Sequence, residues 1–145
     1  MISNGKENSP PFIALKAGAD VWLGNSRGSP ASLNHFTYDW ERNSDKYWDF
    51  TFTEMGKYDL PAVFDYITQM TGFQKIAYVG HSMGTTQMFV NLSLEEEYNL
   101  SSKTSLFVAM VPAVYLDTMN GPGMTFLIYG INLVTSIVDL LGLKY

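Results

Sequence analysis

The spacing of apolar residues along the chain predicts two helices. The first spans residues 59–71, where apolar residues recur at the i, i+3, i+4 and i+7 positions of one helical face. Pro61 is expected to mark the start of this helix or to kink it, and Gly72 is expected to end it. The second helix spans residues 83–94. The apolar faces consist of Leu60, Val63, Phe64 and Ile67 in the first helix and of Met88, Phe89 and Leu92 in the second.

Short apolar runs predict buried strands at residues 19–23, 76–79 and 106–111. Residues 24–51 are rich in Asn, Ser, Gly and Asp, and are expected to form a long loop. Strands and helices therefore alternate along the chain. This order predicts an α/β fold, a parallel sheet with flanking helices.

The composition narrows the class of protein. The chain has 145 residues, enough for one domain, of which 46% are hydrophobic and 16% are charged. These proportions exclude a disordered chain and a coiled coil. A net charge of −5 argues against nucleic-acid binding. The chain has no Cys, and its two His, His35 and His81, lack the spacing of metal ligands, so no metal site and no cofactor are expected.

Residues 80–84 carry the strongest chemical signal. They read Gly-His-Ser-Met-Gly between a predicted strand and a predicted helix, and match the G-x-S-x-G pattern of a nucleophile elbow. Such an elbow lifts the Ser hydroxyl out of a strained turn, so Ser82 is the predicted nucleophile. The backbone N–H of Met83 is predicted to donate to the oxyanion. Gly80 and Gly84 are expected to be required because side chains there would collide with neighbouring backbone.

Residues 24–28, Gly-Asn-Ser-Arg-Gly, match the same pattern and also follow a predicted strand. The sequence after them, Ser-Pro-Ala-Ser, predicts a loop where an elbow needs a helix. Ser26 is therefore expected to lie in a Gly-rich turn held by hydrogen bonds of Ser and Arg. This difference in context favours Ser82 as the nucleophile.

A complete catalytic triad is not readable from the chain. No His follows Ser82, although the acid and then the His follow the Ser in hydrolases with this elbow. His81 is expected to point away from the Ser82 hydroxyl, and His35 lies in the predicted loop. The acidic run 95–97 is expected to be solvated surface. Two further acids, Asp117 and Asp139, have no later His to orient, so the chain alone is expected to be inactive.

Three blocks together resemble the acid lipases, the group of lysosomal acid lipase, gastric lipase and steryl-ester hydrolases. They are residues 17–28, 47–62 and 78–86, and the resemblance covers roughly residues 12–127 in the family's order and spacing. It implies a partial α/β-hydrolase fold in which Ser82 attacks a fatty-acid ester, either triacylglycerol or steryl ester. The family usually has Gln at the position of Met83, where the backbone N–H keeps its role.

The same resemblance implies that this chain is the middle part of a longer enzyme. The second oxyanion donor would precede Met1, and the triad Asp and His would follow Tyr145. Members of the family are commonly secreted or lysosomal. Residues 1–11 lack the apolar run of a signal peptide, so either the protein is cytosolic or Met1 is not the native start.

The C-terminal segment is apolar. We expect residues 1–123 to form part of the catalytic core and residues 124–145 to begin the lid region or form an apolar helix. Residues 124–143 contain one charge, Asp139, and are long enough to span a bilayer. Asn132, Ser136 and Asp139 share one helical face, which favours an amphipathic lid helix over an interfacial anchor or a transmembrane span.

Two other readings of the whole chain remain open. It could be a catalytically dead remnant that binds lipid or a partner, or a membrane-anchored protein without activity. The aromatic residues within 36–52 either pack a long loop onto the core or contact lipid, and the packing interpretation is favoured. Asn91 and Asn99 match the N-glycosylation pattern, and Asn99 is the better candidate because it lies in a predicted loop.

Overall fold

A computed structural model describes residues 5–94 and 98–114, together with residues 121, 129–130, 133–134, 136–137 and 140. The chain divides into two compact units, Met1–Pro112 and Ala113–Tyr145. The expected boundary between Gly123 and Met124 lies outside the described residues, as do Asn132 and Asp139, the acidic run 95–97, and Asp117. In the second unit, the described residues between 129 and 140 are helical. Among the described helices, none has the length and apolar character needed to cross a bilayer.

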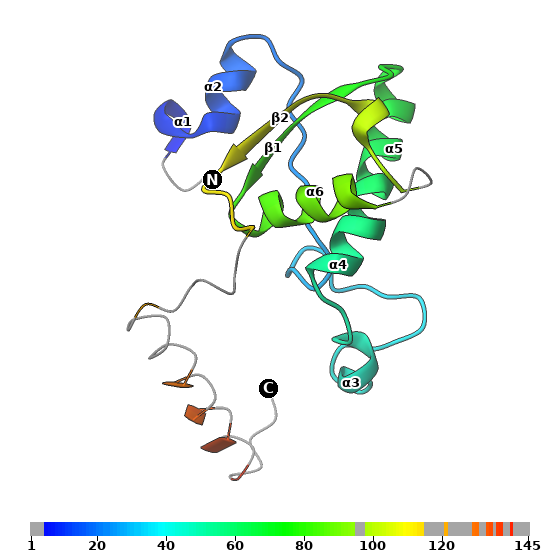
Figure 1. Cartoon of the computed structure of the whole chain (residues 1–145), viewed down its shortest axis with the longest axis vertical. Coiled ribbons are helices and arrows are strands. Elements are labelled where there is room, and N and C mark those ends of the chain that lie inside the picture. The colour runs from blue at the N-terminus through cyan, green and yellow to red at the C-terminus, as the bar shows by residue number, and fades with distance from the viewer. Residues whose placement is uncertain are drawn as a thin grey trace. The chain divides into compact units, whose positions relative to one another are not determined.

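The first unit is built on a parallel pair of strands (Figure 1). Strand β1 (Ile76–His81) pairs with strand β2 (Thr104–Met110), and helix α6 (Met83–Ser93) follows β1 in the crossover between them. In this register Gly80 lies beside Ala109 and His81 lies beside Met110. The two strands, the helix after the first of them and the parallel pairing confirm the prediction for this part of the chain.

Helix α5 (Leu60–Thr71) is the end of a longer helical run. That run begins with α4 (Phe52–Glu54) and continues through a π-helical turn, η1 (Met55–Asp59). It starts earlier than expected because Thr51 and Glu54 form a capping box. The Thr51 side chain accepts a backbone N–H of the first turn, and the Glu54 carboxylate accepts the backbone N–H of Thr51. Pro61 lies in the first turn of α5, directly after the π turn, and Gly72 ends the helix with φ 76° as predicted.

The core lies between these helices and one face of the sheet. Its buried side chains come from α5, from α6 and from the segment before β2, and they are Leu60, Phe64, Met88 and Leu100. Apolar side chains of both strands, among them Tyr78 and Phe107, pack against this cluster. The strand residues that alternate with them face the other way and are exposed, including Val79, Leu106 and Val108. Within the described residues of the first unit, one apolar face of the sheet is therefore covered, and the other, called the open face below, carries these exposed side chains.

The prediction of a buried strand at residues 19–23 is wrong. These residues form an irregular segment in which Trp22 and Leu23 are exposed. A strand needs a neighbour to satisfy its backbone, and the sheet of the described residues contains only β1 and β2. The Trp22 ring instead packs edge-on against Tyr66 of α5, and its Nε1–H donates to Asp20.

Three short helices were not anticipated. Helices α1 (Gly5–Asn8) and α2 (Pro10–Lys16) precede this segment, and α2 begins with prolines, whose fixed φ suits a first turn. Helix α3 (Ser44–Tyr47) interrupts the loop predicted at residues 24–51. The aromatic residues of this region divide into two kinds. Tyr47 is buried and Trp48 and Phe50 pack closely on Gly28 of the same loop, whereas Phe36 and Trp40 are exposed, so packing of the loop onto the core stays a prediction.

Candidate active site

Ser82 occupies the turn between β1 and α6, and its backbone is strained. It has φ 51° and ψ −118°, a region that residues with a side chain rarely adopt. The residue is exposed, and its hydroxyl makes no hydrogen bond that caps α6. Such conformations persist only where the surroundings hold them. Ser82 therefore follows the carboxyl end of a parallel strand, and its side chain is not used to cap the helix.

Three hydrogen bonds to the backbone of Ser82 hold this turn. The Ser82 N–H donates to the carbonyl oxygen of Met110 at 3.0 Å, which joins the turn to the end of β2. The Ser82 carbonyl oxygen accepts the N–H of Thr85 at 2.8 Å and the Thr85 hydroxyl at 2.6 Å. Thr85 is completely buried, and sequence analysis gave it no role because the helical pattern alone does not show which polar residues face inward.

The two glycines around Ser82 differ in how much space they have. A Cβ at Gly80 would lie 2.9 Å from the backbone of Gly84 and Thr85, a distance at which the turn must shift. A Cβ at Gly84 would meet only the Tyr78 hydroxyl, at 3.4 Å. The expectation of a backbone collision is therefore confirmed at Gly80 and is wrong at Gly84.

The Tyr78 side chain is hydrogen-bonded to the start of α6, next to this turn. Its hydroxyl donates to the Gly84 carbonyl oxygen at 3.0 Å, and its ring lies between Phe64 and Phe107. Burial raises the pKa of this hydroxyl, since the charged phenolate would be poorly solvated there. Met83 begins α6 and is half exposed. As the first helical residue it has an N–H without an acceptor inside the helix.

Comparison with known proteins shows the family of this chain. The alpha/beta hydrolase fold family matches residues 4–117, most of the chain. The chain belongs to the α/β-hydrolase fold family. The α/β fold class predicted from the sequence, and its parallel sheet with flanking helices, are thereby confirmed.

Several relatives of this α/β-hydrolase chain are lipases. Human lipase member M is 42% identical over 127 residues, which are 88% of this chain and 29% of the relative. Mouse gastric triacylglycerol lipase is 45% identical and rat lysosomal acid lipase/cholesteryl ester hydrolase 43% identical, each over 121 residues. Those matches cover 83% of this chain and 30% of each relative. The resemblance to acid lipases is confirmed, and the chain spans about three-tenths of the length of these relatives.

The second G-x-S-x-G segment of this α/β-hydrolase chain is a turn. The Ser26 hydroxyl exchanges hydrogen bonds with the Gln87 side chain, at 3.2 Å to its oxygen and 3.1 Å to its nitrogen. Arg27 forms an ion pair with Asp59 at 2.6 Å and also donates its backbone N–H to that carboxylate. The side chains of Ser26 and Arg27 thus hold the turn, as predicted, and the Ser26 hydroxyl bonds it to α6.

Among the described residues, no hydrogen bond joins either His to Ser82. His35 accepts the N–H groups of Thr37 and Tyr38 at its Nδ1 and stacks on the Tyr38 ring. His81 is the last residue of β1 and is exposed. The described part of the chain also holds no cluster of His, Cys, Asp or Glu that could bind a metal ion.

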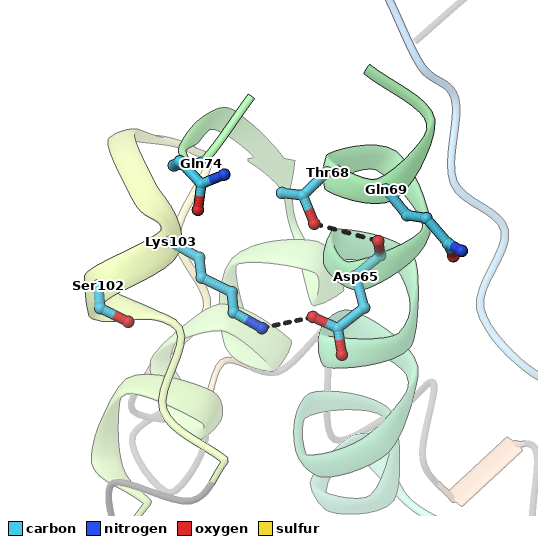
Figure 2. A pocket seen from close by; sticks show the side chains of 6 residues that line it. All are labelled: Asp65, Thr68, Gln69, Gln74, Ser102 and Lys103. Carbon is cyan, nitrogen blue, oxygen red and sulfur yellow. Dashed lines mark hydrogen bonds and ion pairs between the residues drawn. The ribbon is translucent and has the colours of Figure 1, made fainter. Parts of the chain in front are cut away.

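An open pocket of about 470 Å³ lies elsewhere (Figure 2). Polar side chains line it, and Lys103 pairs with Asp65 across it at 2.5 Å. Gln74 precedes β1 and Lys103 precedes β2, so the pocket lies at the amino ends of the strands. Ser82 follows the carboxyl end of β1, where α/β folds place their active sites. The pocket is therefore separate from the Ser82 site.

Proposed function

We propose that this chain carries the nucleophile of a serine ester hydrolase of the lipase type. Ser82 is the nucleophile, and the Met83 N–H is one oxyanion donor. The observation that carries the proposal is the positive φ of Ser82 between a parallel strand and a helix, in an exposed residue whose side chain does not cap α6. Lipase names among the relatives support the reaction class.

The reaction follows from this arrangement. The Ser82 oxygen forms a bond to the ester carbonyl carbon, and its proton passes to a base. Negative charge on the carbonyl oxygen is stabilised by the Met83 N–H and by the positive end of α6. The alcohol then leaves with a proton, and water hydrolyses the acyl-enzyme to release the fatty acid.

The described residues do not supply the base that accepts the Ser82 proton. We infer from the resemblance to acid lipases that the triad acid and His come from a part of the enzyme outside residues 1–145. We therefore expect activity only where this segment is joined to those residues, and none from residues 1–145 alone. Because a hydroxyl without a base is a poor nucleophile, a catalytically dead protein that binds lipid or a partner is the second candidate.

The relatives also suggest the substrate and the setting. Two of them are named for triacylglycerol and for cholesteryl ester hydrolysis. Carboxylic esters of fatty acids are therefore the proposed substrates, met at a lipid interface or membrane surface. A secreted or lysosomal location is proposed from the same names.

Labelling with a fluorophosphonate tests the proposal in the native polypeptide that contains residues 1–145. We expect one label on Ser82, loss of label and ester turnover in Ser82→Ala, and unchanged labelling in Ser26→Ala. Ser26→Ala is a matched control because it alters the other G-x-S-x-G segment. An unlabelled, folded native protein would support the catalytically dead alternative.

A further inference from the structure

Thr85 donates twice to a single atom. Its hydroxyl and its backbone N–H both donate to the Ser82 carbonyl oxygen, at 2.6 Å and 2.8 Å. The residue is completely buried in the first turn of α6. The Thr85 side chain is thus buried and bonded to the Ser82 carbonyl oxygen, whereas Ser82 itself is an exposed residue.

The acceptor makes this contact unusual. Thr and Ser side chains in helices often donate to the carbonyl three residues earlier, and Thr68 does so to Asp65 at 3.0 Å in α5. There the carbonyl belongs to a residue within a regular helix. At Thr85 it belongs to Ser82, whose φ is 51°. A strained conformation of this kind must be held by its surroundings, and the Thr85 hydroxyl supplies one of the contacts that hold it.

The same peptide group carries the oxyanion donor. The Ser82 carbonyl and the Met83 N–H belong to one planar trans peptide, so they point in opposite directions. Because two donors fix the direction of the Ser82 carbonyl, they also fix the direction of the Met83 N–H. This N–H points the opposite way, out of the amino end of α6. Hydrogen bonds to a carbonyl also polarise the peptide group and strengthen its N–H as a donor.

We propose that Thr85 is a positioning residue that aims the Met83 N–H at the oxyanion through the shared peptide group. The inference rests on the proposed roles of Ser82 and Met83. Thr85 does not touch the substrate in this account. The Thr85 hydroxyl therefore contributes more to stabilising the transition state, in which the oxyanion develops, than to binding the substrate.

Substitutions in the native polypeptide separate this role from simple packing. Thr85→Val keeps the shape and removes the hydroxyl, and Thr85→Ser keeps the hydroxyl. We expect Thr85→Val to lower kcat and the fluorophosphonate labelling rate about tenfold or more, with KM changed less than about twofold. Removing an oxyanion donor outright costs about 100- to 1000-fold, and here the donor remains but is less well fixed. Thr85→Ser should recover most of the rate, and Thr68→Val should behave as wild type.

If Thr85→Val does not fold, comparison of Thr85→Ser with Thr85→Cys tests the same role. Ser and Cys are similar in size, but a thiol is a weak donor. Thr85→Cys should then show a lower kcat than Thr85→Ser at similar KM. Wild-type kcat in Thr85→Val, or equal kcat in the Ser and Cys variants, would overturn the positioning role. Full turnover in Ser82→Ala would instead overturn the proposed function itself, so the two failures are distinguishable.

Discussion

The N–H of Ser82 donates to the carbonyl oxygen of Met110 at 3.0 Å, and this bond ties the turn after β1 to the last residue of β2. Val111, the next residue, has φ 52°, close to the 51° of Ser82. Two strained residues thus lie at the carboxyl ends of adjacent strands. The pairing of β1 with β2 therefore fixes the position of Ser82 as well as the core.

Gly80→Ala should disrupt this turn, and Gly84→Ala should not. The new Cβ at residue 80 would lie 2.9 Å from backbone atoms of Gly84 and Thr85, which cannot move without displacing α6. We expect a loss of about 1–3 kcal/mol in unfolding free energy, as for other overpacked sites. At Gly84 the nearest atom is the Tyr78 hydroxyl at 3.4 Å, so a change below about 1 kcal/mol is expected.

Denaturant unfolding and fluorophosphonate labelling of both variants in the native polypeptide test this difference. Gly80→Ala should lose labelling together with stability, because the turn that it displaces carries Ser82. Equal losses in the two variants would show that the contact with the Gly84 and Thr85 backbone is not what requires glycine at residue 80.

Tyr78→Phe should change how stability depends on pH. The raised pKa means that the folded state keeps the Tyr78 proton where the unfolded chain, with a pKa of about 10, releases it. This contribution is fully present below about pH 10 and is lost as the pH rises toward the folded-state pKa. The variant should be about 1 kcal/mol less stable at pH 7, where it lacks the bond to Gly84, and its stability should fall less steeply above pH 10.

Urea unfolding between pH 7 and 11 is the measurement. Tyr66→Phe is the matched control, since Tyr66 is half exposed and packs on Trp22 through its ring alone. Parallel pH curves for wild type and Tyr78→Phe would contradict the prediction.

The sequence predicted those features that depend on local pattern. The apolar spacing around Phe64 indicated α5, and the glycines beside Ser82 indicated the turn and the helix after it. The strand expected at residues 19–23 did not form, because an apolar run becomes a strand only where a neighbour satisfies its backbone. Thr85 was missed for a related reason, since which polar groups are buried depends on contacts between segments that are distant in sequence.

Asn91 is a buried structural residue. Its side chain donates to the carbonyl oxygens of Gly56 at 3.0 Å and Tyr98 at 2.7 Å, and accepts the N–H of Leu100 at 2.9 Å. Asn91→Ala should leave these buried groups unpaired and lower the unfolding free energy by about 1–3 kcal/mol. The exposed Asn25→Ala serves as control and should change it by less than about 0.5 kcal/mol.

The burial of Asn91 also bears on glycosylation. A side chain with no exposed surface cannot carry a glycan in the folded protein, so the Asn91-Leu92-Ser93 pattern should remain unmodified. Ser93→Ala removes the pattern without altering Asn91. The intact mass of the native polypeptide made in a secretory host should then fall only by the mass of one oxygen atom. A larger loss would show a glycan at Asn91. The Asn99 amide is partly buried and donates to the carbonyl oxygens of Leu92 and Leu94, and its glycosylation stays a prediction.

A polypeptide of residues 1–145 produced alone should associate. The open face of the sheet presents Val79, Leu106 and Val108, whose exposed fractions are 47%, 56% and 37%. Apolar surface of this kind favours association, and so do the edges of the sheet, which in the described part of the chain has two strands. We expect strong binding of an apolar dye and aggregates in gel filtration. Replacing Leu106 and Val108 together by Thr should reduce both, because Thr suits a strand but presents a polar hydroxyl. A monomer of wild-type sequence with a sharp, reversible unfolding transition and Ser82-dependent ester turnover would contradict both this prediction and the expected inactivity of the segment alone.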